Sequence, residues 1–208
     1  MGLGLLLGSR HAFEADHIAA VATIVSREKS PLRSGAIGAC WGAGHLSSLL
    51  LVGLPVVGLG LRFPRGLDAP LEVGIAAMII FLGVGGLKRS AGPHAGHDHG
   101  SSIQSLGRRP FWVGAAHGFA GSGALTLVIL ATMPSRVQGL LYLGSFGLGS
   151  VLGMACASAA LSAPVAMAGM SARATRRLGR AVSVASILFG LFYGFTTLTH
   201  AIARHPLL

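Results

Sequence analysis

The chain has 208 residues, of which 52% are hydrophobic and only 11% are charged, and its mean hydropathy is +0.69. A soluble domain typically carries about 25% charged residues, so this composition excludes an ordinary water-soluble protein, which would expose large apolar patches. The net charge of +10 does not indicate nucleic-acid binding, because the basic residues lie between apolar segments rather than on one amphipathic face. The sequence predicts an all-α integral membrane protein in a lipid bilayer.

Six apolar segments follow one another along the chain, each long enough to supply the roughly 20 residues that a spanning helix needs. We expect helices at 3–26, 34–61, 69–88, 111–133, 138–168 and 179–203. Prolines lie at or near most of the breaks, whereas Pro55 and Pro164 lie inside the second and fifth segments, where a kink or an early end is expected. Short connections leave no separate soluble domain, so residues 1–208 are expected to form one transmembrane domain.

Basic residues mark one side of the membrane. The loops after the first, third and fifth segments carry Arg27, Lys29, Arg33, Lys88, Arg89, Arg108, Arg109, Arg173, Arg176, Arg177 and Arg180. The opposite side carries only Arg62, Arg65, Arg136 and Arg204. By the positive-inside rule the first set is cytoplasmic, so both termini are expected outside the cell (inner) membrane.

The two halves of the chain resemble each other weakly. His11-Ala-Phe-Glu14 aligns with His117-Gly-Phe-Ala at a spacing of 106 residues, and Phe81-Leu-Gly83 aligns with Leu188-Phe-Gly190 at nearly the same spacing. Three helices per half would place the halves, about 1–88 and 111–203, in opposite orientations, joined by a histidine-containing loop at 89–110. The sequence predicts a 3+3 inverted repeat, which is a plan that many transporters share; chance similarity between two helices rich in Gly and Ala is the alternative.

The first segment holds the densest set of ionisable groups, which are costly inside a membrane and mark function by default. On a straight helix His11, Glu14 and His17 form one ridge that climbs about 9 Å, while Asp16 points elsewhere. One straight helix therefore cannot place all four groups around one ion. Either the helix is distorted there, or Asp16 orients a histidine, or other helices complete the site.

Two other segments offer histidines, His45 in the second and His117 in the fourth. A single intramembrane histidine is as often a hydrogen-bond donor between helices as a ligand, but four of them favour metal coordination. Imidazole nitrogen suits nickel, zinc and iron, and without a nearby thiolate the set disfavours copper(I), magnesium and calcium. We therefore expect His11, Asp16, His17, His45, His117 and Glu14 to bind a divalent transition-metal ion.

The connecting loop contains His94, His97 and His99, which indicate either a loose metal-binding buffer or a solvated spacer. Glu72, the acid within the third segment, faces either the cavity or the outer interface.

The block Arg10-His11-Ala-Phe-Glu14-Ala-Asp16-His17 resembles the signature of the nickel/cobalt transporter family, usually written H-x4-D-H. Gly44-His45-Leu-Ser47 resembles the G-H-S segment of that family, and the segment after His117 resembles a motif of its short, six-helix, urease-accessory-type nickel permeases. The resemblance implies Ni²⁺ or Co²⁺ uptake through the H-x4-D-H residues. The chain departs from the family in having Glu14 where Asp is usual, in having six helices where longer members have eight, and in lacking the later acidic motif of those members.

Other functions compete with this interpretation. A metal exporter of the same fold would use the same residues. An intramembrane hydrolase would need Ser122 and His200 to meet, which their expected depths disfavour, and a thiol-redox electron carrier would need Cys40 and Cys156 to meet. We expect no enzyme activity and no resident cofactor. The expected partners are the metal ion, the bilayer and either a second copy of the chain or a cytoplasmic metal-accepting protein.

Overall fold

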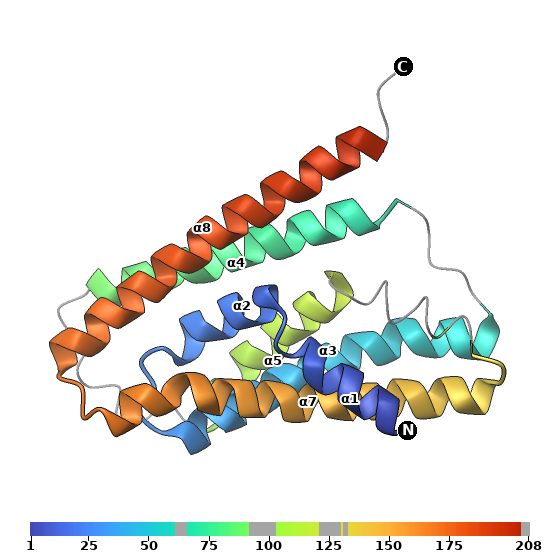
Figure 1. Ribbon diagram of the computed structural model, residues 1–208, viewed down its shortest axis with the longest axis horizontal. Helices are drawn as coiled ribbons and strands as arrows, with labels where there is room; N and C mark the ends of the chain where they lie inside the picture. The colour runs from blue at the N-terminus through green and yellow to red at the C-terminus, as the bar shows by residue number, and fades with distance from the viewer. Residues whose placement is uncertain (61–65, 92–102, 121–129, 131–132, 205–208) are drawn as a thin grey trace.

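The computed structural model describes residues 1–60, 66–91, 103–120, 130 and 133–204, and the regular structure in these ranges is helical. Its helices are α1 (Gly2–His11), α2 (Ala15–Val25), α3 (Pro31–Leu59), α4 (Asp68–Ala91), α5 (Ile103–Ala120), α7 (Arg136–Met167) and α8 (Ala172–Arg204) (Figure 1). Four of them, α3, α4, α7 and α8, are long and apolar enough to cross a membrane. These helices support the membrane location that the composition indicates.

The segment expected as one helix over 3–26 is two helices. Helix α1 ends at His11, where the N–H groups of Phe13 and Glu14 donate to the carbonyls three residues back. Glu14 is extended, with φ −64° and ψ 151°, and α2 begins at the next residue. The chain thus turns between His11 and Asp16, and neither short helix is long enough to span a bilayer by itself.

The other elements differ from the expectation in smaller ways. Pro55 and Pro164 lie inside α3 and α7, which continue through them. Helix α5 begins at Ile103, ahead of Pro110 rather than behind it. The segment expected at 111–133 is described as a helix only as far as Ala120, so the six-helix count stays a prediction.

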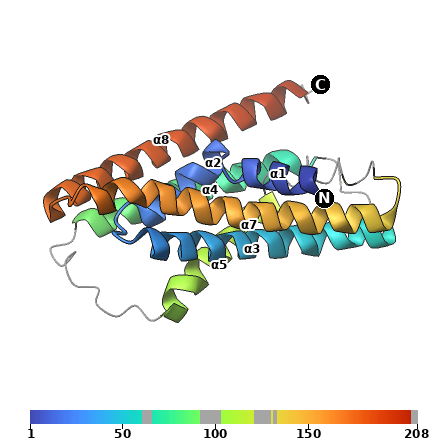
Figure 2. The same cartoon turned by 60° about the horizontal axis from the view of Figure 1, so that its bottom comes forward.

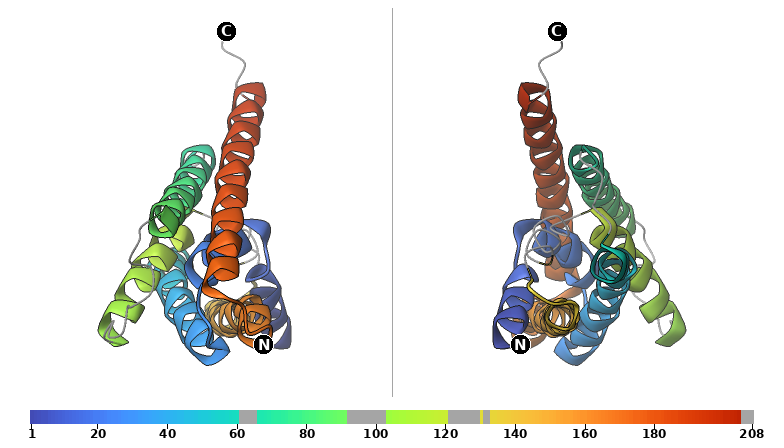
Figure 3. Two further views of the ribbon diagram at one scale, coloured as in Figure 1. Left: turned by 90° about the vertical axis from the view of Figure 1, so that its left-hand side faces the viewer. Right: turned by 90° about the vertical axis from the view of Figure 1, so that its right-hand side faces the viewer.

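The long helices pack as two pairs. Helix α3 lies along α7 (Figure 2), and α4 lies along α8 (Figure 1). Helix α2 lies between the pairs and contacts members of both (Figure 3). Its buried apolar side chains form a core with those of α3, α4 and α7 and with one residue of the α1–α2 turn. The members are Ala12, Ala20, Val21, Val25, Ile37, Trp41, Ile75, Ile79 and Met154. The end of α2 that carries Asp16 and His17 is therefore held inside the bundle.

Helix α1 packs closely against α7 through glycines. A Cβ atom added at Gly8 would collide with the carbonyl oxygen of Phe146, and one added at Gly149 would collide with the carbonyl oxygen of Leu5. Small residues permit such backbone contacts between membrane helices. The Ser9 hydroxyl also donates to the Gly149 carbonyl at 3.3 Å. These contacts fix the end of α1, and hence His11, against α7.

Helix α5 packs against α3 in the same way. A Cβ atom at Gly114 would collide with the carbonyl oxygen of Trp41, and one at Gly44 with the carbonyl oxygen of Phe111. The Ser48 hydroxyl donates to the Ala115 carbonyl at 2.6 Å. These contacts repeat those of the α1–α7 pair. Gly114 and Phe111 follow Gly8 and Leu5 by 106 residues, and Gly149 and Phe146 follow Gly44 and Trp41 by 105 residues. This packing brings His117 on α5 beside His45 on α3.

Candidate metal site

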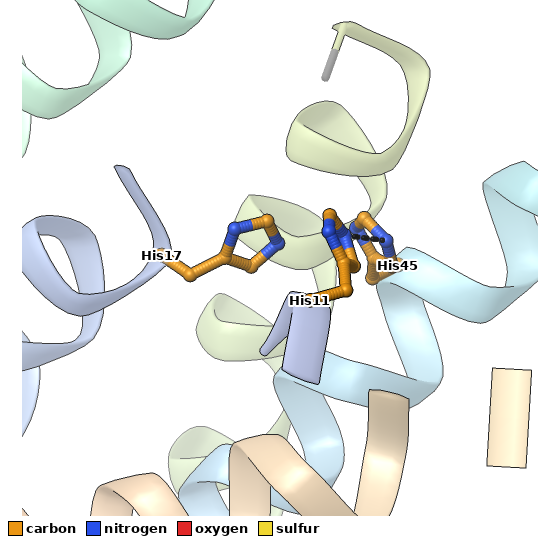
Figure 4. Close-up of side chains that lie close together, drawn as sticks. All are labelled: His11, His17 and His45. Carbon is orange, nitrogen blue, oxygen red and sulfur yellow. Dashed lines mark hydrogen bonds between the residues drawn. The ribbon is translucent and has the colours of Figure 1, made fainter. Parts of the chain in front are cut away.

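Four histidines from four helices meet in the interior of the bundle: His11, His17, His45 and His117. Three of them are 0% exposed, and His11 is 4% exposed. His17 lies at the centre, since its ring centroid is 4.4 Å from that of His11, 5.3 Å from that of His45 and 4.2 Å from that of His117. Figure 4 shows His11, His17 and His45 converging from α1, α2 and α3.

Asp16 joins two of these rings. Its Oδ1 atom lies 3.1 Å from Nδ1 of His17, and its Oδ2 atom lies 3.0 Å from Nε2 of His117. Oδ1 also accepts from the His17 backbone N–H at 2.9 Å, at the positive end of the α2 dipole, which favours an anion there. An ionised carboxylate only accepts hydrogen bonds. Asp16 therefore assigns the proton of His17 to Nδ1 and that of His117 to Nε2.

Glu14 determines the proton position of His11 directly and that of His45 through His11. Its Oε2 atom lies 3.1 Å from Nδ1 of His11, so that nitrogen carries the proton and His11 Nε2 carries a lone pair. His11 Nε2 lies 3.2 Å from Nε2 of His45 (Figure 4), and by the same reasoning His45 is the donor. The His45 proton is then on Nε2, and its Nδ1 atom carries a lone pair.

This assignment leaves three lone pairs on buried nitrogens: Nε2 of His17, Nδ1 of His45 and Nδ1 of His117. In the part of the chain that the structure describes, these three atoms have no hydrogen-bond partner. Burying a polar atom without a hydrogen-bond partner destabilises the fold, and such atoms are retained where function needs them. Neutral imidazole nitrogens with free lone pairs are the form in which histidine ligates a metal ion.

The ligand atoms fall into two groups that share His17. One group is His11, His17 and His45, and the other is Asp16, His17 and His117; within each group the atoms lie within 4.8 Å of one another. Two neighbouring ligand nitrogens bound to one ion at about 2.0–2.1 Å each lie about 3 Å apart, and the Nε2 atoms of His11 and His45 are 3.2 Å apart. This spacing lets both coordinate one ion once the hydrogen bond between them is broken and the proton on Nε2 of His45 has left that nitrogen.

Two aromatic side chains enclose the histidines. The Trp41 ring centroid lies 5.4 Å from that of His17 and 5.6 Å from that of His117, and Phe146 lies 5.5 Å from His11. Both are buried, so they shield the polar cluster from water and lipid. Sequence reasoning missed both residues, although Trp41 precedes His45 by one helical turn and so shares its face of α3.

The other candidate residues lie elsewhere. Glu72 on α4 accepts a hydrogen bond from the Thr197 hydroxyl of α8 at 3.1 Å, which ties those two helices together. Both cysteines are free: Cys40 is half-buried and Cys156 is exposed. His200 is an exposed residue of α8. The loop histidines His94, His97 and His99, together with Ser122, lie outside the described residues.

Comparison with known proteins identifies a relative of similar length. The chain is 30% identical over 202 residues to the urease accessory protein UreH of Bacillus sp. (strain TB-90). The aligned region covers 92% of this chain and 88% of the relative. The chain is 26% identical to the chloroplast proteins FOR GROWTH AND FERTILITY 2 and 1 of Arabidopsis thaliana, covering 93% of this chain but 57% and 60% of theirs. No protein-family model and no solved structure matches the chain.

The name of the Bacillus relative describes an accessory protein of urease rather than a urease, in agreement with the expectation that this chain is not an enzyme. At this identity and coverage, the chain belongs to the family of the urease accessory protein UreH.

Proposed function

We propose that this protein is a membrane permease that takes up a divalent transition-metal ion, Ni²⁺ or Co²⁺. The observation that carries the proposal is the buried convergence of four histidines and Asp16, with three imidazole nitrogens that lack a partner among the described residues. Ionisable groups inside a membrane protein are expensive and mark substrate pathways. The membership in the UreH family and the resemblance of the His11–His17 block to nickel/cobalt transporters support the same function.

The ligand chemistry supports the choice of metal. Imidazole nitrogens with one carboxylate suit Ni²⁺, Co²⁺ and Zn²⁺, whereas Mg²⁺ and Ca²⁺ prefer oxygen ligands and Cu⁺ prefers sulfur. One group of candidate ligands is three histidines, the other is two histidines and Asp16, and neither contains a cysteine. Nickel or cobalt is chosen over zinc because of the family resemblance.

The two ligand groups are alternative positions for a single ion. A neutral imidazole has one lone pair, so His17 ligates one ion at a time although it belongs to both groups. An ion that exchanges His11 and His45 for Asp16 and His117 moves a few ångströms through the bundle while His17 retains it. The turn between α1 and α2 lets His11 and His17 move relative to each other during this exchange.

The packing supports alternating access by two inverted halves. The close contact of α1 with α7 is repeated by that of α5 with α3, at a spacing of 105 or 106 residues. In transporters built from inverted repeats, the site lies near the midplane on discontinuous helices, and the halves rock around it. The histidine cluster lies at such a break, between α1 and α2.

The membrane potential supplies energy for uptake. A doubly charged ion that moves inward gains about 4.6 kcal/mol per 100 mV of inside-negative potential. This favours import, with the basic loops on the cytoplasmic side and both termini outside.

The proposal is tested by the metal content of cells that express the chain in trace Ni²⁺ or Co²⁺. The His17→Ala variant removes the shared ligand, and His200→Ala serves as the matched control because His200 is an exposed histidine of α8. Import predicts raised metal in wild type and His200→Ala, and background metal in His17→Ala at equal membrane levels. Lowered metal that recovers in His17→Ala would identify an exporter. Equal metal in all strains, for both ions, would refute the proposal.

A further inference from the structure

Four arginines gather at one end of the molecule, away from the histidine cluster. They are Arg27 in the connection between α2 and α3, Arg89 near the end of α4, and Arg176 and Arg180 in the first turns of α8. The end of α4 and the beginning of α8 lie side by side at the left of Figure 1. Three separate parts of the chain thus contribute to one basic cluster.

Hydrogen bonds hold two of these side chains in place. Arg27 donates from Nη1 to the carbonyl oxygen of Arg89 at 3.0 Å and from Nη2 to the hydroxyl of Ser90. Arg180 donates from Nη2 to the carbonyl oxygen of Ser90 at 2.9 Å. The Arg27 side chain crosses α8 at Gly179, where a Cβ atom would lie 2.8 Å from its Nε atom. The guanidinium groups are therefore positioned before any ligand binds.

Capping of α4 explains only part of the cluster. Cations favour the carbonyl end of a helix, and this accounts for Arg27 and Arg180. It does not account for Arg89 and Arg176, whose guanidinium groups donate no hydrogen bond within the described ranges. Both side chains are exposed, so their donors are available to a ligand.

The positive charge of the cluster is not balanced by the described part of the protein. None of the four arginines forms an ion pair with a described carboxylate. Glu28, the neighbour of Arg27, accepts from the backbone N–H groups of Lys29 and Ser30 and lies 4.0 Å from Nε of Arg33. Burial, and then the charges of Arg89, Arg176 and Arg180, lower the pKa of Arg27. A bound anion would relieve this repulsion.

The height of the cluster matches the phosphate layer of a bilayer. The apolar span of α8 is Ala172–Ala203, with 32 residues, whereas about 20 residues cross the hydrocarbon core. Because the first turns of α8 carry Arg176 and Arg180, which are costly in hydrocarbon, we place these turns in the headgroup region. Arg89 lies next to the end of the α4 span, Ala69–Ser90.

We propose that Arg27, Arg89, Arg176 and Arg180 form a binding site for a phosphate group, supplied by an anionic phospholipid where α4, α8 and the α2–α3 connection meet. Guanidinium groups bind phosphate oxygens with paired hydrogen bonds, and basic pockets between membrane helices bind anionic headgroups. The lipid tails would lie along the exposed apolar face of α8. This site is independent of the metal site and of its proposed function.

The test is native mass spectrometry of the purified protein titrated with phosphatidylglycerol or phosphatidylcholine. Arg176→Gln removes one guanidinium that makes no described hydrogen bond. Arg136→Gln is the matched control, because Arg136 is an exposed arginine at the start of α7. We expect phosphatidylglycerol to bind in preference to phosphatidylcholine. Arg176→Gln should weaken that binding about fivefold, the effect of one cation near an anionic surface, and Arg136→Gln should not.

Competition with inorganic phosphate identifies the source of the phosphate group. A site that binds the lipid and resists inorganic phosphate takes its ligand from the bilayer. A site that binds inorganic phosphate alone, with the same loss in Arg176→Gln, takes a soluble phosphate. Equal binding of the two lipids without phosphate binding, or equal losses in Arg176→Gln and Arg136→Gln, would overturn the proposal.

Discussion

The Nε2 atoms of His11 and His45 lie 3.2 Å apart in the interior of the bundle, although the two residues are 34 positions apart in sequence. Glu14 at Nδ1 of His11 determines which of the two nitrogens carries the proton in this pair. Asp16 does the same for His17 and His117. The two acids thus determine which ring nitrogen carries the proton in all four histidines, and they leave three buried ring nitrogens with a free lone pair.

The sharing of His17 predicts how ligand substitutions affect binding. His45→Ala leaves the group of Asp16, His17 and His117 intact, and His117→Ala leaves the group of His11, His17 and His45 intact. Each should weaken Ni²⁺ binding without abolishing it, whereas His17→Ala should abolish it. Isothermal titration of the purified protein measures this, with one ion per chain in wild type. A stoichiometry of two ions, or complete loss in all three variants, would contradict the shared ligand.

The two acids should differ in their importance. Asp16→Asn introduces an amide that cannot accept from both His17 and His117 through two carboxylate oxygens, and loss of such an orienting carboxylate typically lowers metal affinity about 10–100-fold. Glu14→Gln should cost less than about tenfold, because the Glu14 side chain is 49% exposed and water can replace it as acceptor. Competition between Ni²⁺ and a chromophoric chelator measures both affinities. A larger loss of Ni²⁺ affinity in Glu14→Gln than in Asp16→Asn would contradict this order and show that Glu14 contributes more to binding.

Glycine contacts should determine how α1 and α5 are held. Gly8→Ala and Gly114→Ala each place a methyl group against a backbone carbonyl of the neighbouring helix, and such overpacking typically costs about 1–3 kcal/mol. Gly144→Ala is the control on α7, since nothing lies within 4 Å of its Cβ position. Thermal unfolding in detergent should show lower midpoints for the first two variants only. An unchanged midpoint for both would mean that these helices do not pack as described.

The cysteines should be dispensable. Cys40 and Cys156 are free and belong to neither ligand group, so the double replacement by Ala should leave metal uptake at the wild-type level. The measurement is the metal content of cells at matched expression. Loss of activity in this variant, with the protein still folded, would favour a thiol-redox function.

Much of the site could be predicted from the sequence because its residues are ionisable groups in otherwise apolar helices. His11, Asp16, His17, His45 and His117 stand out on that ground, and the structure brings all five together. Their division into two groups could not be predicted, because it depends on the direction in which α1 ends and α2 begins.

The break itself has no local signal. Residues 12–14 are Ala-Phe-Glu and contain neither glycine nor proline, so helix propensity alone predicts continuity. The packing of α1 on α7 and of α2 between the helix pairs determines the turn, and these are tertiary contacts. The start of α5 at Ile103 differs from the expected start at 111 for the opposite reason, because Pro110 is a local signal for a helix boundary although the helix continues through it.

The most direct test of the metal site is X-ray absorption at the nickel edge on purified protein loaded with one equivalent of Ni²⁺. The account predicts a single ion with at least three nitrogen or oxygen ligands at about 2 Å, with the outer-shell scattering of imidazole rings and no sulfur. His17→Ala should not retain the ion after dialysis. A spectrum without imidazole scattering, or one unchanged in His17→Ala, would contradict the assignment of these histidines as the binding site.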